Sequence, residues 1–174
     1  MDWGKVLFDP NGRIGQREFW TGVLVIIVGN LLVYALPVIG FLLWLILIWV
    51  GVAVYGKRLH DAGTTGWLHA IPWAVTIIMT IIAMVMVGAR LFQLILESLG
   101  DSEPSQESII GFIAASGGAI GMLTLGSLVW LGYTLWVGFL QSEPGANRYG
   151  PAPVIEGRAA DAATSSQQSS GADD

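Results

Sequence analysis

The sequence predicts an all-α, polytopic membrane protein with four transmembrane helices and both termini on the cytoplasmic side. Hydrophobic residues make up 53% of the 174-residue chain and charged residues only 12%, whereas soluble domains carry about 25% charged residues. The uncharged residues fall into long runs, and roughly 20 such residues suffice to cross a bilayer. Seven of the eight basic residues lie on one side of the resulting topology.

The first two spans form a predicted antiparallel hairpin. A polar lead, residues 1–18, precedes span one, and we expect that span to be retained rather than cleaved as a signal peptide. Span one covers about 19–36 and span two about 38–55. Pro37 and Gly40 interrupt the apolar pattern, and the connection has almost no polar residues. A tight turn at the far membrane face therefore joins these spans.

The next segment is a polar cytoplasmic loop, residues 56–66, followed by span three at about 67–89. Arg90 ends the uncharged stretch. Residues 90–118 are expected to form an acidic outer loop, because acids gather between Glu97 and Glu107.

The last apolar run, residues 109–140, is too long for one simple span. We place a break at Gly117-Gly118 and span four at about 119–140, which leaves open whether residues 109–116 enter the bilayer. The membrane domain then covers residues 19–155. Residues 156–174 are rich in Ala, Ser, Gln, Gly and Asp, a composition typical of a disordered tail.

The distribution of basic residues orients the four spans. Basic residues near span ends mark the cytoplasmic side of a membrane, and on that side lie Lys5, Arg13, Arg17, Lys57, Arg58, Arg148 and Arg158. Only Arg90 lies elsewhere. The net charge of -5 reflects acids in the outer loop and the tail and says little about partners.

Three polar segments at span ends are expected to converge on the cytoplasmic surface. We interpret them as a shared polar cluster formed by Arg13, Arg17, Glu18, Arg58, His60, Asp61, Asn147 and Arg148. Arginines there can bind lipid phosphates as forked donors. The same residue types at span ends are also expected for topology alone, so a purely structural role stays open.

Metal and cofactor chemistry is not expected. The chain has no cysteine and only two histidines, His60 and His69, which leaves no multi-histidine or thiolate metal site. We expect His60 to bond to a carbonyl or carboxylate at a helix start. Its neighbour Asp61 leaves an acid–base pair as an alternative.

Few polar side chains lie at membrane depth. Asn30 is the most polar of them, and we expect it to bond across helices rather than to line a path. The pattern Gly117-x-x-x-Gly121 favours close helix contact, either within one chain or in a homo-oligomer.

The three polar segments resemble the bacterial DUF805 family, small inner-membrane proteins of unknown function. The matching residues are Gly12-Arg13 with Arg17-Glu18-Phe19-Trp20, Lys57-Arg58-Leu59-His60-Asp61 with Gly66-Trp67, and Asn147-Arg148-Tyr149-Gly150-Pro151. Lys57, Thr65 and Leu68 depart from the usual Arg, Ser and Trp of that pattern. The resemblance implies a multi-pass protein of the bacterial inner (plasma) membrane, and it implies no activity.

The sequence shows no Walker phosphate loop, no G-x-S-x-G elbow, no H-E-x-x-H and no dinucleotide fingerprint. The leading hypothesis is a non-enzymatic inner-membrane protein whose polar cluster binds anionic lipid headgroups or a membrane protein partner. A small oligomeric transporter or channel is the alternative. A membrane enzyme acting on a lipid-linked phosphate, with His60 and Asp61 as acid and base, is the third hypothesis. No nucleic-acid partner and no cofactor are expected.

Overall fold

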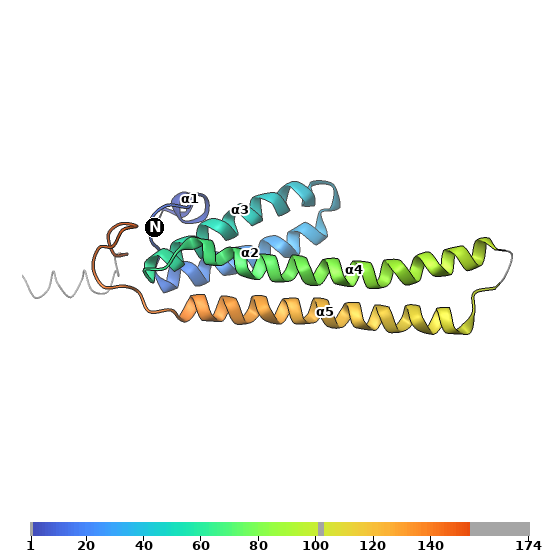
Figure 1. Cartoon of the computed structure of the whole chain (residues 1–174). Coiled ribbons are helices and arrows are strands. Elements are labelled where there is room, and N and C mark those ends of the chain that lie inside the picture. Colours follow the sequence, from blue (N-terminus) through green and yellow to red (C-terminus); the bar gives the residue numbers. More distant parts are fainter. Residues whose placement is uncertain (1, 101–102, 154–174) are drawn as a thin grey trace, which may run out of the picture. The chain divides into compact units, whose positions relative to one another are not determined.

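The computed structural model describes residues 2–100 and 103–153, and within them it contains helices and no strand. Four helices are long and apolar enough to cross a membrane, so the predicted all-α, four-span fold class is confirmed. The elements in chain order are α1 (Trp3–Phe8), α2 (Gln16–Ala35), α3 (Pro37–Asp61), the 3-10 helix η1 (Gly66–His69), α4 (Ala70–Leu99) and α5 (Gln106–Phe139) (Figure 1).

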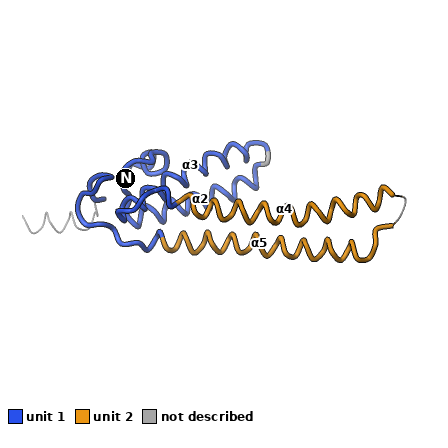
Figure 2. The backbone as a smooth tube through the Cα atoms, in the orientation of Figure 1, with its two compact units in different colours: residues 1–68, 137–174 blue, residues 69–136 orange. Residues whose placement is uncertain are grey.

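The chain forms two compact units (Figure 2). Unit 1 comprises residues 1–68 and 137–174, and so contains α1, α2, α3, the C-terminal end of α5 and the segment that follows it. Unit 2, residues 69–136, contains α4 and most of α5.

Within unit 1, α2 and α3 form an antiparallel hairpin with a glycine seam. A Cβ on Gly22 would lie 2.8 Å from both methyl groups of Val54, and a Cβ on Gly29 would lie 2.6 Å from a methyl group of Leu47. The two glycines are seven residues apart, and so are their partners, which fixes one register along the hairpin. Small residues at such contacts let helix backbones approach closely where lipid supplies no hydrophobic driving force.

Helix α3 is longer than the predicted span two. It begins at Pro37, which suits a first helical turn because its missing N–H has no intrahelical partner there. It continues to Asp61, so the expected loop at residues 56–66 is wrong as far as Asp61. Arg58 and His60 in the last turn favour the negative end of the helix dipole. The helix stops before Gly63, which has a φ of +71°.

The segment expected as an outer loop, residues 90–118, is helical over most of its length. Helix α4 continues to Leu99 and α5 begins at Gln106, so only residues 100–105 connect them. Glu97 accepts hydrogen bonds from the Ser105 backbone N–H at 2.9 Å and from the Ser108 hydroxyl at 2.5 Å. These bonds join the two helix ends.

The predicted break at Gly117-Gly118 is absent, and residues 109–116 belong to the single helix α5. A glycine inside a helix costs only about 1 kcal/mol relative to alanine. A break in an apolar setting would leave backbone groups without partners, at several kcal/mol each. Gly118 has a packing role as well, since a Cβ there would lie 2.9 Å from the Met86 Cε of α4.

The predicted polar lead is partly helical. Asp2 caps α1 by accepting a hydrogen bond from the Lys5 backbone N–H, and α2 already begins at Gln16. The predicted disordered tail, residues 156–174, lies outside the described residues.

Candidate functional site

A buried group of three charges lies at the end of α3. Asp61 Oδ1 accepts a hydrogen bond from Nε of Arg13 at 3.0 Å, and Nη2 of Arg13 lies 3.0 Å from the same oxygen as an ion pair. Asp61 Oδ2 accepts a hydrogen bond from Nη1 of Arg58 at 2.6 Å. All three side chains are at most 1% exposed. The Ser142 hydroxyl donates to the same Oδ2 at 2.5 Å. Charge-assisted bonds of this kind satisfy the carboxylate fully, which burial of a charge requires.

The remaining donors of Arg13 bind the backbone of the segment after α5. Nη1 donates to the carbonyls of Gly145 at 2.6 Å and Gly150 at 3.4 Å, and Nη2 donates to the carbonyl of Glu143 at 2.6 Å. The Glu143 backbone N–H in turn donates to the Asp61 carbonyl at 2.8 Å. Arg13 therefore fastens this segment to the end of α3.

Arg58 fastens the end of α5 to the end of α3 in the same way. Its Nη2 donates to the carbonyls of Gly138, at 3.4 Å, and Leu140. The last carbonyls of a helix have no intrahelical partner, and a buried cation there also favours the negative end of the dipole. Gly138 lies directly against the Trp20 ring of α2, which leaves no room for a side chain.

A turn at residues 9–12, before α2, places Arg13 next to Asp61. Asp9 accepts hydrogen bonds from the backbone N–H of Asn11 at 2.9 Å and from its side-chain amide at 3.0 Å. These bonds to Asn11 favour the carboxylate and hold the pKa of Asp9 below its usual value. Gly12 follows with a φ of +89°, a conformation that suits glycine.

The Asn147 segment forms a tight turn against α3. The Asn147 side-chain amide donates to the His60 carbonyl at 2.9 Å and to Glu143 Oε2 at 2.8 Å, and its oxygen accepts from the Tyr149 N–H at 2.9 Å. Paired backbone bonds of 3.0 Å join Asn147 and Gly150. An asparagine side chain suits this position because it bonds to the backbone in both directions.

His60, Tyr149 and Arg148 form a stack on the surface of unit 1. The rings of His60 and Tyr149 are parallel, with an angle of 8° and centroids 3.8 Å apart. The guanidinium of Arg148 lies 4.7 Å from the Tyr149 ring centroid, within the range of a cation–π contact. His60 Nδ1 also lies 3.3 Å from the Gly12 carbonyl oxygen, which fits the expected hydrogen bond to a carbonyl.

Two of the expected cluster residues, Arg17 and Glu18, lie in the first turn of α2. Arg17 is exposed on the first turn of α2. Glu18 accepts a hydrogen bond from the Gly15 N–H at 2.8 Å and so caps the start of α2. The structure thus brings together Arg13, Arg58, His60, Asp61, Asn147 and Arg148 from three separate segments.

The structural role of Lys57 was not predicted from the sequence. Its ammonium is buried and donates to the carbonyls of Lys5 at 2.5 Å and Val6 at 2.7 Å, which lie at the end of α1. Trp49 of α3 adds a hydrogen bond from its indole N–H to the Phe8 carbonyl at 2.9 Å. A short helix with unpaired C-terminal carbonyls and a lysine on the neighbouring span is the signal that would have indicated this contact.

Three polar side chains at depth bond within their own helices. The Asn30 amide donates to the Ile26 carbonyl of α2 at 2.9 Å, so the expected bond across helices is not the one that forms. Thr124 and Ser127 bond in the same way to carbonyls four residues earlier in α5. Such local bonds are common for short polar side chains in helices.

Within the chain, the small-residue pattern of α5 contacts α4 through a neighbouring glycine, and the homo-oligomer alternative stays a prediction. Gly118, rather than Gly117 or Gly121, contacts α4, and a Cβ on either of the latter would meet no atom within 4 Å.

The fold and this site define a class of protein: an all-α, multi-pass membrane protein in which a polar network ties segments at the helix ends together. The chain belongs to the family described as protein of unknown function (DUF805), whose model matches residues 7–151. No curated protein and no solved structure matches the chain.

Proposed function

We propose that this protein is a non-enzymatic component of the bacterial inner membrane that binds anionic lipid headgroups at its cytoplasmic face. Both termini lie on that face, because seven of the eight basic residues then lie at cytoplasmic span ends. The binding surface is the cytoplasmic cap, which we define as the network of Arg13, Arg58, His60, Asp61, Asn147 and Arg148.

The observation that carries the proposal is the position of Arg148. Its guanidinium is exposed and stacked on Tyr149, and among the described residues it makes one hydrogen bond, to the Gly63 carbonyl at 3.4 Å. A guanidinium has five donors and stays charged at any physiological pH. Most donors of Arg148 are therefore available to the forked oxygens of a lipid phosphate.

Arg13 and Arg58 support this surface rather than contact lipid. Both are buried and bonded to Asp61 and to backbone carbonyls. Releasing either one to a headgroup would break one of the two buried ion pairs of Asp61, at a cost of about 3–5 kcal/mol. This assigns the headgroup contact to Arg148, with the exposed Arg17 as a second basic residue on the same unit.

The N-terminal helix supports an interfacial position for the cap. In α1, Trp3 is 41% and Phe8 51% exposed, whereas Val6 is buried. Lys5 between them is also exposed. Exposed aromatic and basic residues on a short helix at the end of a span are typical of the membrane–water interface.

Native mass spectrometry of the protein released from nanodiscs of phosphatidylglycerol and phosphatidylethanolamine tests the proposal. We expect the wild type to retain phosphatidylglycerol at the cap and Arg148→Gln to retain about tenfold less of this cap-bound lipid, since hydrogen bonds to charged groups contribute about 1.5–3 kcal/mol. Arg158→Gln is the matched control, because it removes one positive charge without changing any of the six residues that define the cap.

Equal lipid retention by Arg148→Gln and the control would overturn the proposal. A protein retained by the wild type from its own membrane, and lost with Arg148→Gln while lipid retention is unchanged, would replace it with a protein-partner function.

A further inference from the structure

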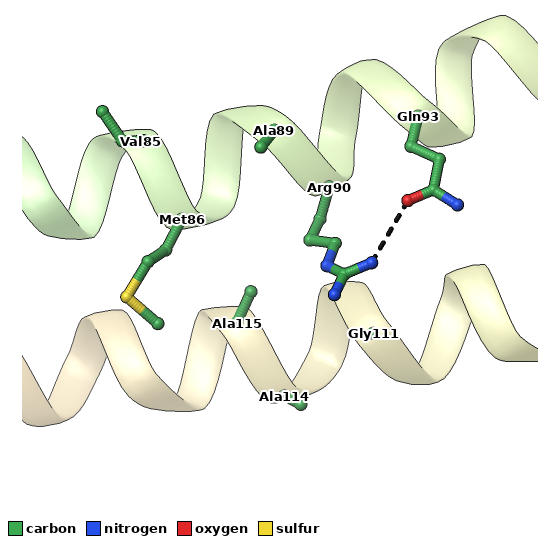
Figure 3. Close-up of a pocket in the computed structure, with 8 residues that line it drawn as sticks. All are labelled: Val85, Met86, Ala89, Arg90, Gln93, Gly111, Ala114 and Ala115. Atoms are coloured by element: carbon green, nitrogen blue, oxygen red, sulfur yellow. Dashed lines mark hydrogen bonds between the residues drawn. The ribbon is translucent and has the colours of Figure 1, made fainter.

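Arg90 differs from the buried arginines of the cap in how its side chain is satisfied. It lies on α4, and its guanidinium reaches over Gly111 of α5, where a Cβ would lie 3.5 Å from the Arg90 Cζ (Figure 3). Among the described residues it makes one hydrogen bond, to Gln93 Oε1 at 3.2 Å. Arg13, in contrast, uses every nitrogen of its guanidinium.

The guanidinium opens into a pocket within unit 2. The cavity has a volume of about 550 Å³. Its α4 side is formed by Val85, Met86, Ala89, Arg90 and Gln93, and its α5 side by Gly111, Ala114 and Ala115 (Figure 3). The space exists because the α5 side carries no side chain larger than a methyl group. The pocket is thus lined by the Arg90 guanidinium, which has unused hydrogen-bond donors, by the Gln93 side chain and by an apolar wall.

The position of Arg90 along α4 places the pocket at a membrane boundary. Ala70 to Ala89 are 20 uncharged residues, and at 1.5 Å per residue they span about 30 Å, the thickness of the hydrocarbon core. Helix α4 follows α3 and η1 in the chain, and the end of α3 belongs to the cap. The proposed topology therefore puts Arg90, at the far end of the span, at the opposite, outer face. Its charge then lies at the depth of lipid phosphates, with Val85 and Met86 at the depth of acyl chains.

We infer that this pocket binds the phosphate of an anionic glycerophospholipid of the outer leaflet. The phosphate oxygens accept hydrogen bonds from the free donors of Arg90. Gln93 orients the guanidinium by accepting one hydrogen bond from it, while the Gln93 amide nitrogen donates to Glu97 and Ser108. One acyl chain lies against Val85 and Met86, where the small residues of α5 leave room. A guanidinium at the edge of a low-dielectric layer favours such a partner because water satisfies its donors poorly there.

Two variants separate the charge from the cavity. Arg90→Gln removes the cation. Gly111→Leu keeps the cation and fills the space in front of it. Gly121→Leu is the matched control, because it makes the same substitution on the same helix at a position where a Cβ meets no atom within 4 Å.

The experiment counts phosphatidylglycerol molecules retained by each variant in native mass spectrometry after release from nanodiscs of phosphatidylglycerol and phosphatidylethanolamine. In the Arg148→Gln background, where the cap has lost its lipid, we expect Arg90→Gln and Gly111→Leu each to retain about tenfold less phosphatidylglycerol than Arg148→Gln alone, and Gly121→Leu to keep it. The shared background makes the loss at this pocket independent of the cap.

Retention by both pocket variants at the level of Arg148→Gln alone would overturn the inference. Loss with Arg90→Gln but not with Gly111→Leu would overturn it too, since charge alone would then explain binding. Inorganic phosphate added to the detergent-solubilised protein distinguishes the source: we expect no change in thermal midpoint, and stabilisation equal to that by phosphatidylglycerol would assign the pocket to a soluble anion instead. Circular dichroism confirms the helix content of each variant, and Gly111→Leu keeps the test valid if Arg90→Gln does not fold.

Discussion

Arg13 and Asp61, which are 48 residues apart in the sequence, form a buried ion pair in which Nε and Nη2 of the arginine both lie 3.0 Å from one carboxylate oxygen. Arg58 occupies the other oxygen at 2.6 Å. One carboxylate therefore joins the segment before α2, the end of α3 and the segment after α5. The order of the cap depends on Asp61 more than on any other side chain in it.

Asp61→Asn should destabilise the protein strongly. The substitution leaves two buried guanidinium groups without a counter-charge, which costs about 3–5 kcal/mol. Thermal unfolding in detergent, followed by circular dichroism, measures the loss. Asp2→Asn is the control, because its ion pair with Lys5 is long, at 3.8 Å, and both side chains are mostly exposed, so we expect its midpoint to match that of the wild type. Equal midpoints for both variants would contradict the role of the buried group.

Alanine should destabilise the protein at Gly22, in the glycine seam of the α2–α3 hairpin, but not at Gly132 of α5. Gly22→Ala places a Cβ 2.8 Å from the stiff, branched side chain of Val54 and should cost about 1–3 kcal/mol through overpacking. Gly132→Ala meets no atom within 4 Å and should be neutral or stabilise by up to about 1 kcal/mol. Steric trapping or detergent unfolding compares the two, and a destabilised Gly132→Ala with an unaffected Gly22→Ala would refute the register.

Lys57→Met should release α1 from the hairpin. The buried ammonium satisfies two carbonyls at the end of α1, and methionine keeps the volume but provides no donor. Hydrogen–deuterium exchange should show faster exchange of the amides of Trp3–Phe8 and unchanged exchange in α2. Lys5→Met serves as the control because Lys5 is exposed. Unchanged protection of α1 in Lys57→Met would show that Trp49 and apolar packing suffice.

Tyr149 should determine the affinity of the cap for headgroups although it carries no charge. Tyr149→Ala removes the ring that supports the Arg148 guanidinium, so an ordered donor becomes a flexible one, and retained phosphatidylglycerol should fall severalfold because more side-chain entropy is lost on binding. Tyr149→Phe keeps the ring and should retain lipid like the wild type. If both variants bind like the wild type, the stack has no part in recognition.

The sequence predicted the fold class and the meeting of three polar segments because both follow from local features. Uncharged runs of membrane length require helices, and span ends on one side bring Arg13, Asp61 and Asn147 near each other. The limits of the helices were not predictable in the same way. Residues Lys57 to Asp61 are mostly polar, as is typical of a loop, but buried contacts with α1 and with the segment after α5 keep them helical.

The burial of each arginine could not be predicted either. Arg58 and Arg148 both lie near span ends, but one is 1% exposed and the other is on the surface. That difference arises from the contact of Arg58 with Asp61, three positions further on, and from its contacts with Ser142 and the Leu140 carbonyl, which are more than 80 positions away. The sequence marked Arg90 only as the one basic residue that departs from the charge pattern. Its pocket could not be predicted, because the small residues that open it lie on another helix.

Both proposed lipid sites depend on which face of the membrane each occupies, and the absence of cysteine from the chain makes this directly measurable. A single cysteine is introduced either at Ala146, in the segment after α5, or at Glu103, between α4 and α5. Each variant is labelled in intact cells with a membrane-impermeant maleimide. We expect Glu103→Cys to react in cells with a permeabilised outer membrane, and Ala146→Cys to react only after the inner membrane is disrupted. The reverse pattern would contradict the account, because the cap would then face away from the cytoplasm.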